Sequence, residues 1–254
     1  MKDSTPKIRL DKLLLQRGLV PSRERAQAMV IAGKVLVNGQ KIEKSGTSVE
    51  SSSEIRLLGD DLKFVSRGGL KLERALEHWK IDVRGLVCVD VGASTGGFTD
   101  CLLQHGALRV IAIDTGHGQI AFNLRQDERV RLLERTNARY LTRAQLGEEV
   151  SFIAMDVSFI SATLVIAPVV SAAFPEETNA RAGRELVVLL KPQFEVGREH
   201  VGKGGIVRDA DAQQQAVAKV REAVAALQPK LIDVIDSPIL GAEGNREFLL
   251  YARF

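Results

Sequence analysis

The sequence predicts an α/β fold with a mostly parallel, seven-stranded sheet covered by helices on both faces, preceded by a small α+β module. From residue 87 onward, short apolar strands alternate with helical segments, which is typical of a parallel sheet. The first strand, VCVDV at 87–91, runs into a glycine-rich turn that opens a helix. Residues 8–65 show two helical segments and a hairpin instead, and therefore predict a separate module.

The N-terminal module is predicted from local signals. Leucines at helical spacing predict a first helix that stops near Gly18, and Ser22 is a plausible N-cap for a second helix that ends at Gly33. KVLVNGQKI then predicts two strands joined by an Asn38-Gly39 turn. The polar, serine-rich segment 45–55 predicts a loop, followed by the strand EIRLL.

The larger region is predicted to begin with a helix from Lys71 through Trp79. The strands that follow are VCVDV, RVIAID, RVRLLE, SFIAMDV, ELVVLLK, LIDVID and REFLLYARF. Helices are predicted near 97–105 and 119–126, through TLVIAPVVSAA and over 210–227, and a glycine-rich stretch occupies 192–208. The last two strands have no helix between them and predict an antiparallel hairpin at the sheet edge.

Composition limits the class of protein. The chain has 254 residues, 45% hydrophobic and 26% charged, as in ordinary globular proteins. No apolar run approaches the ~20 residues of a membrane span, and the N-terminus lacks the apolar core of a signal peptide, so we expect a cytoplasmic protein without a membrane partner. Cys88 and Cys101 form neither a disulfide framework nor a zinc site, and no metal is predicted.

Charge is unevenly distributed along the chain. Residues 1–71 hold 14 Lys and Arg against 8 Asp and Glu, whereas the remainder holds 21 against 24. Such asymmetry indicates an N-terminal surface for a polyanion. A solvated basic face remains the alternative.

The glycine-rich turn predicts a nucleoside-bearing cofactor. A dinucleotide site would show GxGxxG, but here the glycines are Gly92, Gly96 and Gly97, with Ala93 at the second position. That spacing suits a cofactor without phosphates, whose ribose hydroxyls would meet Asp114 at the end of the next strand. S-adenosyl-L-methionine fits best, and a turn without catalytic meaning is the alternative.

Four charged residues stand at or near strand ends, where ligands of open α/β sheets bind. Asp156 closes SFIAMD, Lys191 closes ELVVLLK and Glu247 opens the last strand. Lys71 begins the helix that precedes the sheet. Each alone is readily explained as a solvated charge, but their joint order around a cofactor turn favours a catalytic set.

Several strings carry a resemblance to a known family. SRGGLKL, DVGASTGGFTDCLLQ, LERTNAR, MDVSFIS, LLKPQFEVG and GNREF resemble the TlyA-type ribosomal RNA 2′-O-methyltransferases, also labelled haemolysin A. RLDKLLLQRGLVPSRERAQAMVIAGKVLVNGQKI resembles the S4-type RNA-binding domain. The resemblance implies an S4-type domain over 1–59, a linker over 60–66, and over 67–254 an FtsJ-like class I (Rossmann-like) methyltransferase domain.

The resemblance also implies an activity. The family methylates a cytidine ribose in ribosomal RNA, using S-adenosyl-L-methionine and a Lys–Asp–Lys–Glu tetrad that transfers onto Lys71, Asp156, Lys191 and Glu247. Because the chain stops directly after the last strand, it is similar to the short members that act on the large subunit (23S), with the small subunit (16S) left open. Lys191 is expected to accept the proton of the 2′-oxygen or to stabilise it electrostatically, and the other three to orient it.

Binding residues are expected around this set. The cofactor floor is predicted from Gly92, Ala93, Ser94, Thr95, Gly97 and Phe98. Asp90 is expected either to order the turn or to face the donor's amino group, and Asn137 either to reach the adenine or to serve as a turn residue. The predicted RNA contacts are Arg9, Lys12, Arg17, Arg23, Arg25, Lys34, Lys41, Arg67, Arg198 and Lys203. The last two belong to stretch 192–208, either a clamp or a plain connection.

Two other classes of function compete with this interpretation. A membrane-active haemolysin is suggested only by the family label, and the sequence shows no signal peptide or spanning segment for it. A non-catalytic RNA-binding assembly factor would require a broken tetrad or a filled cofactor turn, and the sequence shows neither. We expect ribosomal RNA or ribosomal subunits as partners, and no protein partner is evident.

Overall fold

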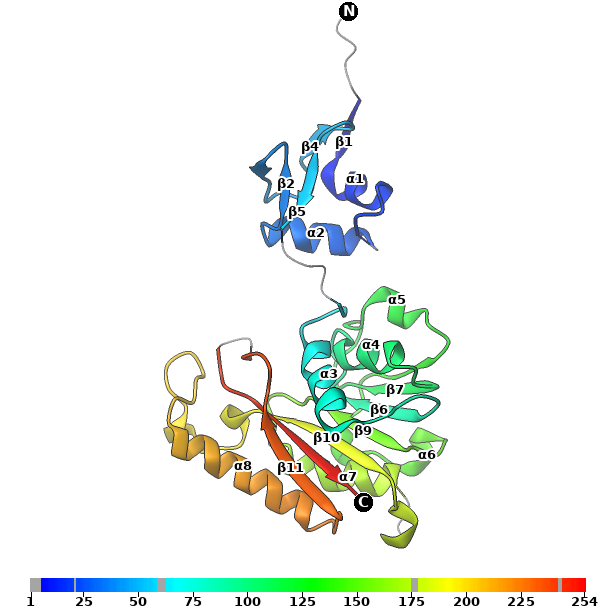
Figure 1. Cartoon of the computed structure of the whole chain (residues 1–254), viewed down its shortest axis with the longest axis vertical. Helices are drawn as coiled ribbons and strands as arrows, with labels where there is room; N and C mark the ends of the chain where they lie inside the picture. Colours follow the sequence, from blue (N-terminus) through cyan, green and yellow to red (C-terminus); the bar gives the residue numbers. More distant parts are fainter. Residues whose placement is uncertain (1–5, 21, 59–62, 175–177, 242–243) are drawn as a thin grey trace, which may run out of the picture. The chain divides into compact units, whose positions relative to one another are not determined.

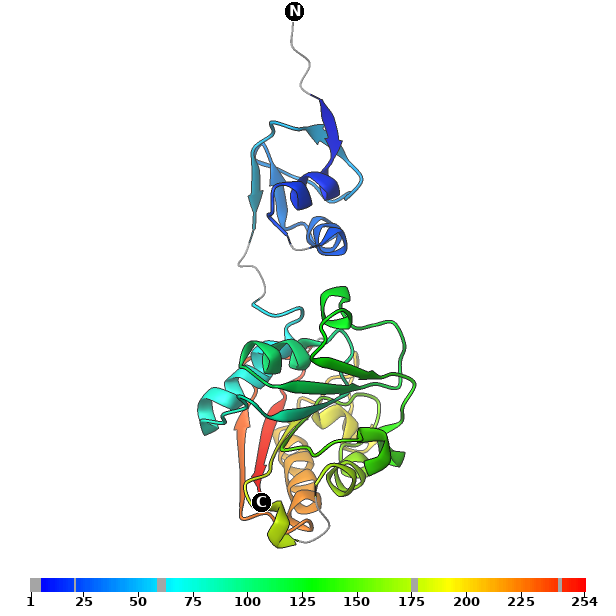
Figure 2. The same cartoon turned by 90° about the vertical axis from the view of Figure 1, so that its right-hand side faces the viewer.

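The computed structural model describes residues 6–20, 22–58, 63–174, 178–241 and 244–254 (Figures 1 and 2). The chain divides into two compact units, Met1–Asp61 and Leu62–Phe254. The division falls within the predicted linker 60–66, of which residues 60–62 lie outside the described residues.

The N-terminal unit packs two helices against small sheets (Figure 1). Helices α1 (Leu10–Gln16) and α2 (Arg23–Ile31) enclose a core that includes Leu10, Leu14 and Val30. Strand β2 (Val35–Val37) lies between β3 (Gln40–Lys41) and β5 (Ile55–Leu57). The predicted cap is confirmed, because Ser22 Oγ accepts a hydrogen bond from the Arg25 backbone N–H at 3.2 Å.

The predicted loop over 45–55 is partly wrong. Residues Ser48–Glu50 form strand β4, which pairs antiparallel with β1 (Lys7–Arg9). Val49 is the apolar residue of this polar stretch that is buried, and it lies opposite Ile8. One buried side chain in a polar segment leaves too little alternation to predict a strand from the sequence.

The C-terminal unit is built on one seven-stranded sheet in the order β11-β12-β10-β9-β6-β7-β8. Its strands are β6 (Val87–Val91), β7 (Arg109–Ile113), β8 (Val130–Leu133), β9 (Phe152–Met155), β10 (Glu185–Leu190), β11 (Leu231–Asp236) and β12 (Phe248–Arg253). Neighbouring strands pair in parallel except that β12 is antiparallel to both β10 and β11. The predicted antiparallel hairpin at the sheet edge is confirmed, with β12 as its inner strand.

Helices cover both faces of this sheet (Figures 1 and 2). Alternate residues of β6 face opposite sides: Cys88 packs with one cluster and Val89 with the other. The helices on the Cys88 side are α3 (Gly68–Trp79), α4 (Gly97–Gln104) and α5 (Phe122–Arg125), and those on the Val89 side are α6 (Arg143–Leu146), α7 (Thr163–Ala173) and α8 (Ala210–Ala225). Helix α5 is shorter than the predicted 119–126, and α8 ends two residues before the predicted 227.

Short 3₁₀ turns complete the unit: η1 (Ala138–Tyr140), η2 (Thr178–Arg181), η3 (Pro192–Phe194) and η4 (Arg198–His200). The chain leaves β6 toward β7 and β8 on one side of the sheet, whereas β9 and β10 lie on the other. The strand order therefore reverses between β6 and β9. Such a reversal opens a crevice at the carboxyl ends of these two strands, which is where open α/β sheets bind ligands.

Candidate active site

The glycine turn after β6 packs directly on the loop after β9. Gly92 has φ +86°, and a Cβ there would lie 2.3 Å from the backbone oxygen of Asp156. At the start of α4, a Cβ on Gly97 would lie 2.2 Å from Ser66 Oγ, in the segment that leads into α3. Position 92 therefore requires glycine, and a side chain at Gly97 would have to displace Ser66. The close packing brings three separate segments of the chain to one crevice.

Asp90 orders this turn by hydrogen bonding to α4, the helix that follows the turn. It is fully buried, and its Oδ2 accepts hydrogen bonds from the backbone N–H (2.9 Å) and the hydroxyl (2.6 Å) of Thr99 in α4. Burial raises the pKa of Asp90 to about 7, with the charges of Asp156 and Asp114 adding to the rise and the Thr99 hydrogen bonds opposing it. Asp90 lies outside the residues that line the pockets, so of its two predicted roles these contacts favour ordering the turn.

One pocket of about 400 Å³ lies at the ends of β6, β7 and β9. Its lining includes Gly92, Ser94, Asp114, Asn137 and Asp156. Asp114 accepts hydrogen bonds from the backbone N–H groups of Ser94 (2.7 Å) and Gly116 (2.6 Å), which fixes its carboxylate at the pocket wall. Asn137 accepts from the Arg139 backbone N–H at 3.0 Å, so it caps η1 as well as lining the pocket.

These features suit S-adenosyl-L-methionine. A carboxylate with fixed orientation at the end of β7 can accept hydrogen bonds from a ribose diol, and Gly92 and Ser94 line the same pocket, so the turn backbone is open to the amino-acid end. The pocket volume lies in the range of small-ligand sites, about 300–1,000 Å³. The residues present therefore fit the predicted cofactor.

A second pocket of about 260 Å³ adjoins the first and shares Gly92, Ser94 and Asp156 with it. All four predicted tetrad residues line this second pocket. So do several residues of the predicted cofactor floor and one predicted RNA contact: Ala93, Thr95, Gly97, Phe98 and Arg67. The structure thus brings the glycine turn and the four charged side chains to one place.

The tetrad is arranged as two ion pairs. Lys71 Nζ lies 2.5 Å from Glu247 Oε2, and these side chains are 11% and 3% exposed. Lys191 Nζ lies 2.6 Å from Asp156 Oδ1 and donates to Ser158 Oγ at 2.7 Å. Each cation faces a carboxylate inside a sheltered pocket, so the ammonium groups are held in fixed positions rather than moving freely in solvent.

The loop between β9 and α7 carries residues that the sequence analysis did not single out. Ser158 contacts Lys191, and Phe159 has φ +64° with 93% of its surface exposed. The Phe159 ring lies 5.4 Å from the ring of Phe194 in η3. A non-glycine residue in the left-handed region costs about 1–3 kcal/mol, and such residues cluster at functional sites, so Phe159 is a candidate functional residue of the pocket that it lines. Phe159 is part of the string MDVSFIS, but from the sequence alone a phenylalanine there is expected in the core. Its exposure and its backbone angles are visible only in the structure.

Comparisons with known proteins identify the family. The FtsJ-like methyltransferase profile matches residues 64–254, and the S4 domain profile matches residues 8–55. The 16S/23S rRNA (cytidine-2′-O)-methyltransferase TlyA of Mycobacterium tuberculosis (strain ATCC 25618 / H37Rv) is 42% identical, over 96% of this chain and 89% of that protein. This chain belongs to the TlyA family of FtsJ-like methyltransferases.

Two further proteins agree with this placement in the TlyA family. The 23S rRNA (cytidine-2′-O)-methyltransferase TlyA of Campylobacter jejuni is 33% identical, over 91% of this chain and 93% of that protein. A solved structure described as a candidate hemolysin, from Streptococcus thermophilus, has a TM-score of 0.72 and 40% identity and covers 98% of this chain and 89% of its own. Among the described residues, no helix combines the length and apolarity needed to cross a membrane.

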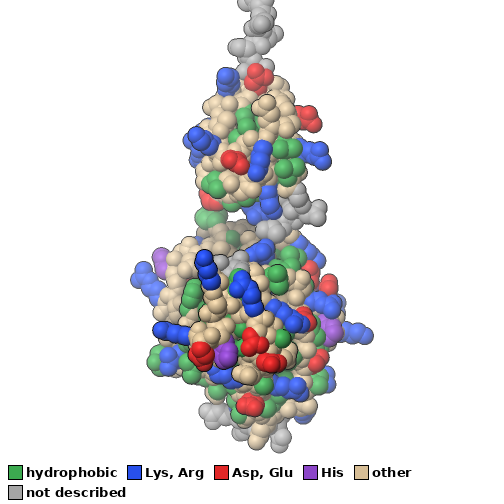
Figure 3. Space-filling model, turned by 90° about the vertical axis from the view of Figure 1, so that its left-hand side faces the viewer, with side chains coloured by type: hydrophobic (Ala, Val, Ile, Leu, Met, Phe, Trp, Pro, Cys, Tyr) green, Lys and Arg blue, Asp and Glu red, His purple; other side chains and the backbone are tan. Residues whose placement is uncertain are grey.

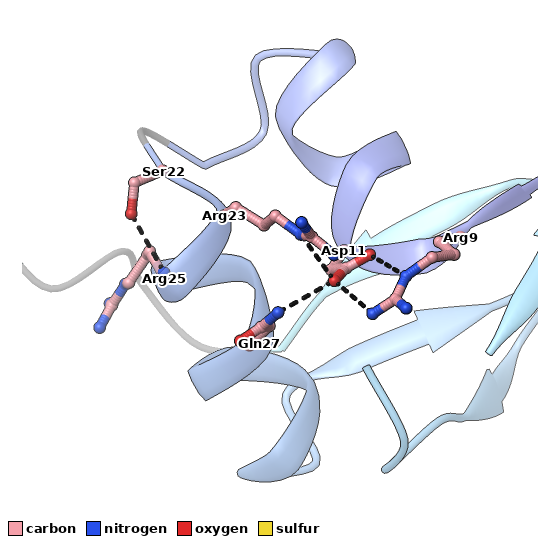
Figure 4. A network of polar contacts seen from close by, with 6 residues as sticks. All are labelled: Arg9, Asp11, Ser22, Arg23, Arg25 and Gln27. Atoms are coloured by element: carbon pink, nitrogen blue, oxygen red, sulfur yellow. Dashed lines mark hydrogen bonds and ion pairs between the residues drawn. The ribbon is translucent and has the colours of Figure 1, made fainter. Parts of the chain in front are cut away.

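In the S4 domain, a buried carboxylate holds two of the predicted RNA contacts, Arg9 and Arg23 (Figure 4). Asp11 is fully buried and accepts hydrogen bonds from Arg9 Nε and Nη2 at 3.0 and 2.9 Å, and from Arg23 Nε and Gln27 Nε2, both at 3.0 Å. These contacts, with Arg9 first, hold the pKa of Asp11 well below its usual range. The arginine side chains remain 45% and 42% exposed, so they are fixed at one end and open to solvent.

The other predicted RNA contacts differ in their surroundings. Arg17 donates to the backbone oxygens of Ser51 (2.6 Å) and Ser53 (2.7 Å), and so ties α1 to the segment before β5. Arg25 is half-buried, whereas the remaining predicted contacts are exposed: Lys12, Lys34, Lys41, Arg67, Arg198 and Lys203. Figure 3 shows Lys and Arg side chains spread over the face of the S4 domain rather than gathered in one patch.

Proposed function

We propose that this protein transfers the methyl group of S-adenosyl-L-methionine to the 2′-hydroxyl of a cytidine in the ribosomal RNA of the large subunit (23S). The observation that carries the proposal is the meeting of two lysine–carboxylate pairs, one buried and one partly buried, with the glycine turn in adjoining pockets. Both TlyA relatives are named for 23S rRNA, and one is named for 16S rRNA as well. Acting on ribosomal RNA, the protein would work in the cytoplasm.

The cofactor would supply an electrophilic methyl carbon on a sulfonium, so the protein has mainly to align the acceptor and to manage its proton. The cofactor would be held by the turn at Gly92, by the carboxylate of Asp114 and by the residues lining the larger pocket. Because the two pockets share Gly92 and Asp156, an acceptor ribose in the smaller pocket would meet the reactive end of the cofactor there.

Lys191 is the group proposed to act on the 2′-oxygen. Its Nζ is fixed by Asp156 and Ser158, both on the loop after β9. In that position it either accepts the hydroxyl proton, after releasing one of its own to solvent, or as an ammonium stabilises the negative charge that develops on the 2′-oxygen as the oxygen attacks the methyl carbon. Lys71, held by Glu247, supplies a second fixed cation in the same pocket, where it orients the ribose or the adjacent phosphate.

Phe159 and the S4 domain would hold the RNA. The exposed aromatic ring of Phe159 lines the larger pocket next to Ser158, which contacts Lys191, and it offers a face on which a nucleobase can stack. The arginines anchored by Asp11 offer guanidinium groups to phosphates, which give affinity and position rather than sequence reading. In this proposal the predicted S4 module binds the RNA, and the predicted methyltransferase domain both holds the acceptor nucleotide and carries out the transfer.

Transfer of tritium-labelled methyl from S-adenosyl-L-methionine tests the proposal. The purified protein is incubated with isolated large subunits, small subunits or protein-free 23S RNA, and the methylated ribose is mapped by reverse-transcription stops at low nucleotide concentration. We expect label on a cytidine of the large subunit. Label on a base, or no label on any RNA, contradicts the proposal. In the second case an RNA-binding assembly factor becomes the better explanation, and lysis of erythrocytes by the purified protein would support the haemolysin alternative.

A further inference from the structure

Two loops carry much of the proposed chemistry, and they come from different parts of the chain. The loop over 156–162 follows β9 and holds Asp156, Ser158 and Phe159. The segment over 191–196 follows β10 and holds Lys191 and Phe194. The second segment is only a 3₁₀ turn, and the first has no regular structure, so neither is held in place by a strand or an α-helix of its own.

Glu195 connects the two loops through residues that line neither pocket. Its side chain is 2% exposed. Oε2 accepts a hydrogen bond from the Ser161 hydroxyl at 2.5 Å, and Oε1 accepts one from the Ala162 backbone N–H at 2.7 Å. One carboxylate thus accepts hydrogen bonds from a backbone N–H and from a hydroxyl, both in the two residues before α7.

Helix α8 supports this carboxylate from a third direction. Lys219 Nζ lies 3.6 Å from Glu195 Oε2 and donates to the Glu195 backbone oxygen at 2.8 Å. Burying a carboxylate is costly unless it is paired and hydrogen-bonded. Here the nearby ammonium group and the two hydrogen bonds offset that cost, so the charged side chain can be kept inside.

Other contacts between the two loops involve residues that line the pockets. Lys191 reaches Asp156 and Ser158, and the Phe159 and Phe194 rings lie 5.4 Å apart. Glu195 is four residues from Lys191, and Ser161 is three residues from Ser158, so a shift at the Glu195 contact is transmitted over a short distance to the proposed reacting group. Effective methyl transfer depends on such alignment, and a misplacement of about 1 Å can cost about 100-fold in rate.

We propose that Glu195 is a positioning residue: it fixes the loop after β10 on the loop after β9, and thereby sets Lys191 against Asp156 and Ser158. It touches neither cofactor nor RNA in this assignment. The inference rests on the proposed methyl transfer for its kinetic consequence but not for its structural one, so the two are measured separately.

The kinetic test uses single-turnover methyl transfer to large subunits at saturating labelled S-adenosyl-L-methionine. We expect Glu195→Ala to slow transfer by about 10- to 100-fold, while the dissociation constant of S-adenosyl-L-methionine changes by about threefold or less. Glu195→Gln keeps an oxygen for the Ala162 N–H, and its amide can donate to the Ser161 hydroxyl, so we expect it to recover most of the rate. In the Glu195→Ala protein, adding Ser158→Ala should cost little more, because the loop is already displaced.

The matched control is Glu185→Ala, at the opposite end of β10. Glu185→Ala also removes a hydrogen bond, the one that Glu185 accepts from the Tyr251 hydroxyl. Glu185 is not one of the residues that line either pocket. We expect its transfer rate to stay within about twofold of wild type. Equal slowing of the Glu185 and Glu195 variants, or a Glu195→Ala rate within twofold of wild type, overturns the inference. If Glu195→Ala does not fold, Glu195→Asp, which is too short for both contacts, replaces it with the same expected slowing.

The structural test does not depend on RNA. Amide hydrogen exchange of 156–162 and 191–196 should become faster in Glu195→Ala and stay unchanged in Glu185→Ala. An inactive wild-type protein with this exchange pattern contradicts the proposed function and leaves Glu195 as the contact that holds the loops. Unchanged exchange in Glu195→Ala overturns the positioning inference, whatever the activity.

Discussion

The two units use buried carboxylates in opposite ways. In the S4 domain, Asp11 is fully buried but surrounded by two arginines and a glutamine, and its pKa falls well below its usual range. In the methyltransferase domain, Asp90 is equally buried but, within the described part of the chain, hydrogen-bonded only to Thr99, and its pKa rises to about 7. Burial alone therefore decides little, because the partners determine whether a carboxylate holds cations or resists ionisation.

This difference corresponds to where each unit places its positively charged side chains. The S4 domain uses its buried acid to fix positive charge at the surface. The methyltransferase domain keeps its cations within the pocket, each against its own carboxylate, and leaves Asp90 without a cation partner among the described residues. One unit is suited to a polyanion and the other to a single reacting group. The predictions below test this contrast from the largest expected effect to the smallest.

Removing the Lys191 side chain is expected to have the largest effect on methyl transfer. Lys191→Ala should lower single-turnover methyl transfer by at least about 1,000-fold, because both alignment and charge at the 2′-oxygen are lost. Binding of the RNA, measured by filter retention, should change by less than about threefold if the S4 domain supplies most of the affinity.

Lys191→Arg separates the two roles proposed for this side chain. Arginine keeps the charge but cannot accept a proton in a protein. Activity within about tenfold of wild type favours electrostatic stabilisation, whereas loss as large as in Lys191→Ala favours proton acceptance. The exposed, distant Lys230→Ala serves as the control and should transfer methyl at the wild-type rate. A Lys191→Ala protein with near-normal transfer would show that the assignment is wrong.

Much of this contrast could be predicted from the sequence, because it depends on local signals. The turn at Gly92 and the strand ends at Asp156 and Lys191 are visible as short strings, and their common edge follows from a parallel sheet. The capped helix at Ser22 and the Asn38-Gly39 turn are equally local.

What could not be predicted depends on long-range pairing. Lys71 and Glu247 are separated by 176 positions and meet only because β12 inserts between β10 and β11. Nothing in the sequence indicates which lysine pairs with which acid. Arg17 resembles a free basic side chain until β4 and its flanking turn bring the backbone oxygens of Ser51 and Ser53 to it.

The exposed ring of Phe159 gives the next largest effect. Phe159→Ala should lower kcat/KM for the large subunit by about 10- to 100-fold, since stacking of one base on an aromatic ring is worth about 1–3 kcal/mol. Phe159→Trp keeps a stacking face and should recover most of this loss. Phe122 on α5 is similarly exposed, at 70%, but lines neither pocket, so Phe122→Ala is the control. If both alanine variants behave alike, the ring at 159 has no particular role.

Asp90 should produce a pH-dependent effect on stability. The pKa of Asp90 in the folded protein, about 7, lies above the value of about 4 expected in the unfolded chain. The free energy of unfolding is therefore highest at low pH and falls as the pH rises from about 4 to about 7. Asp90→Asn does not titrate and keeps an oxygen for Thr99. The stability of the variant relative to wild type should therefore increase by about 2–3 kcal/mol from pH 5 to pH 8, measured by urea unfolding. A difference that is constant with pH contradicts the raised pKa.

The smallest expected effect lies in the S4 domain, where many weak phosphate contacts share the work. Arg23→Ala should weaken RNA binding only several-fold at physiological salt, and should reduce the slope of log affinity against log salt by about one, as expected when one phosphate contact is lost. Lys44→Ala removes the same charge from an exposed position outside the Asp11 network and should leave the slope nearly unchanged. An equal change in slope for both variants would mean that general basicity, rather than the arginines fixed by Asp11, binds the RNA. The contrast drawn between the two units would then hold only for the catalytic pocket.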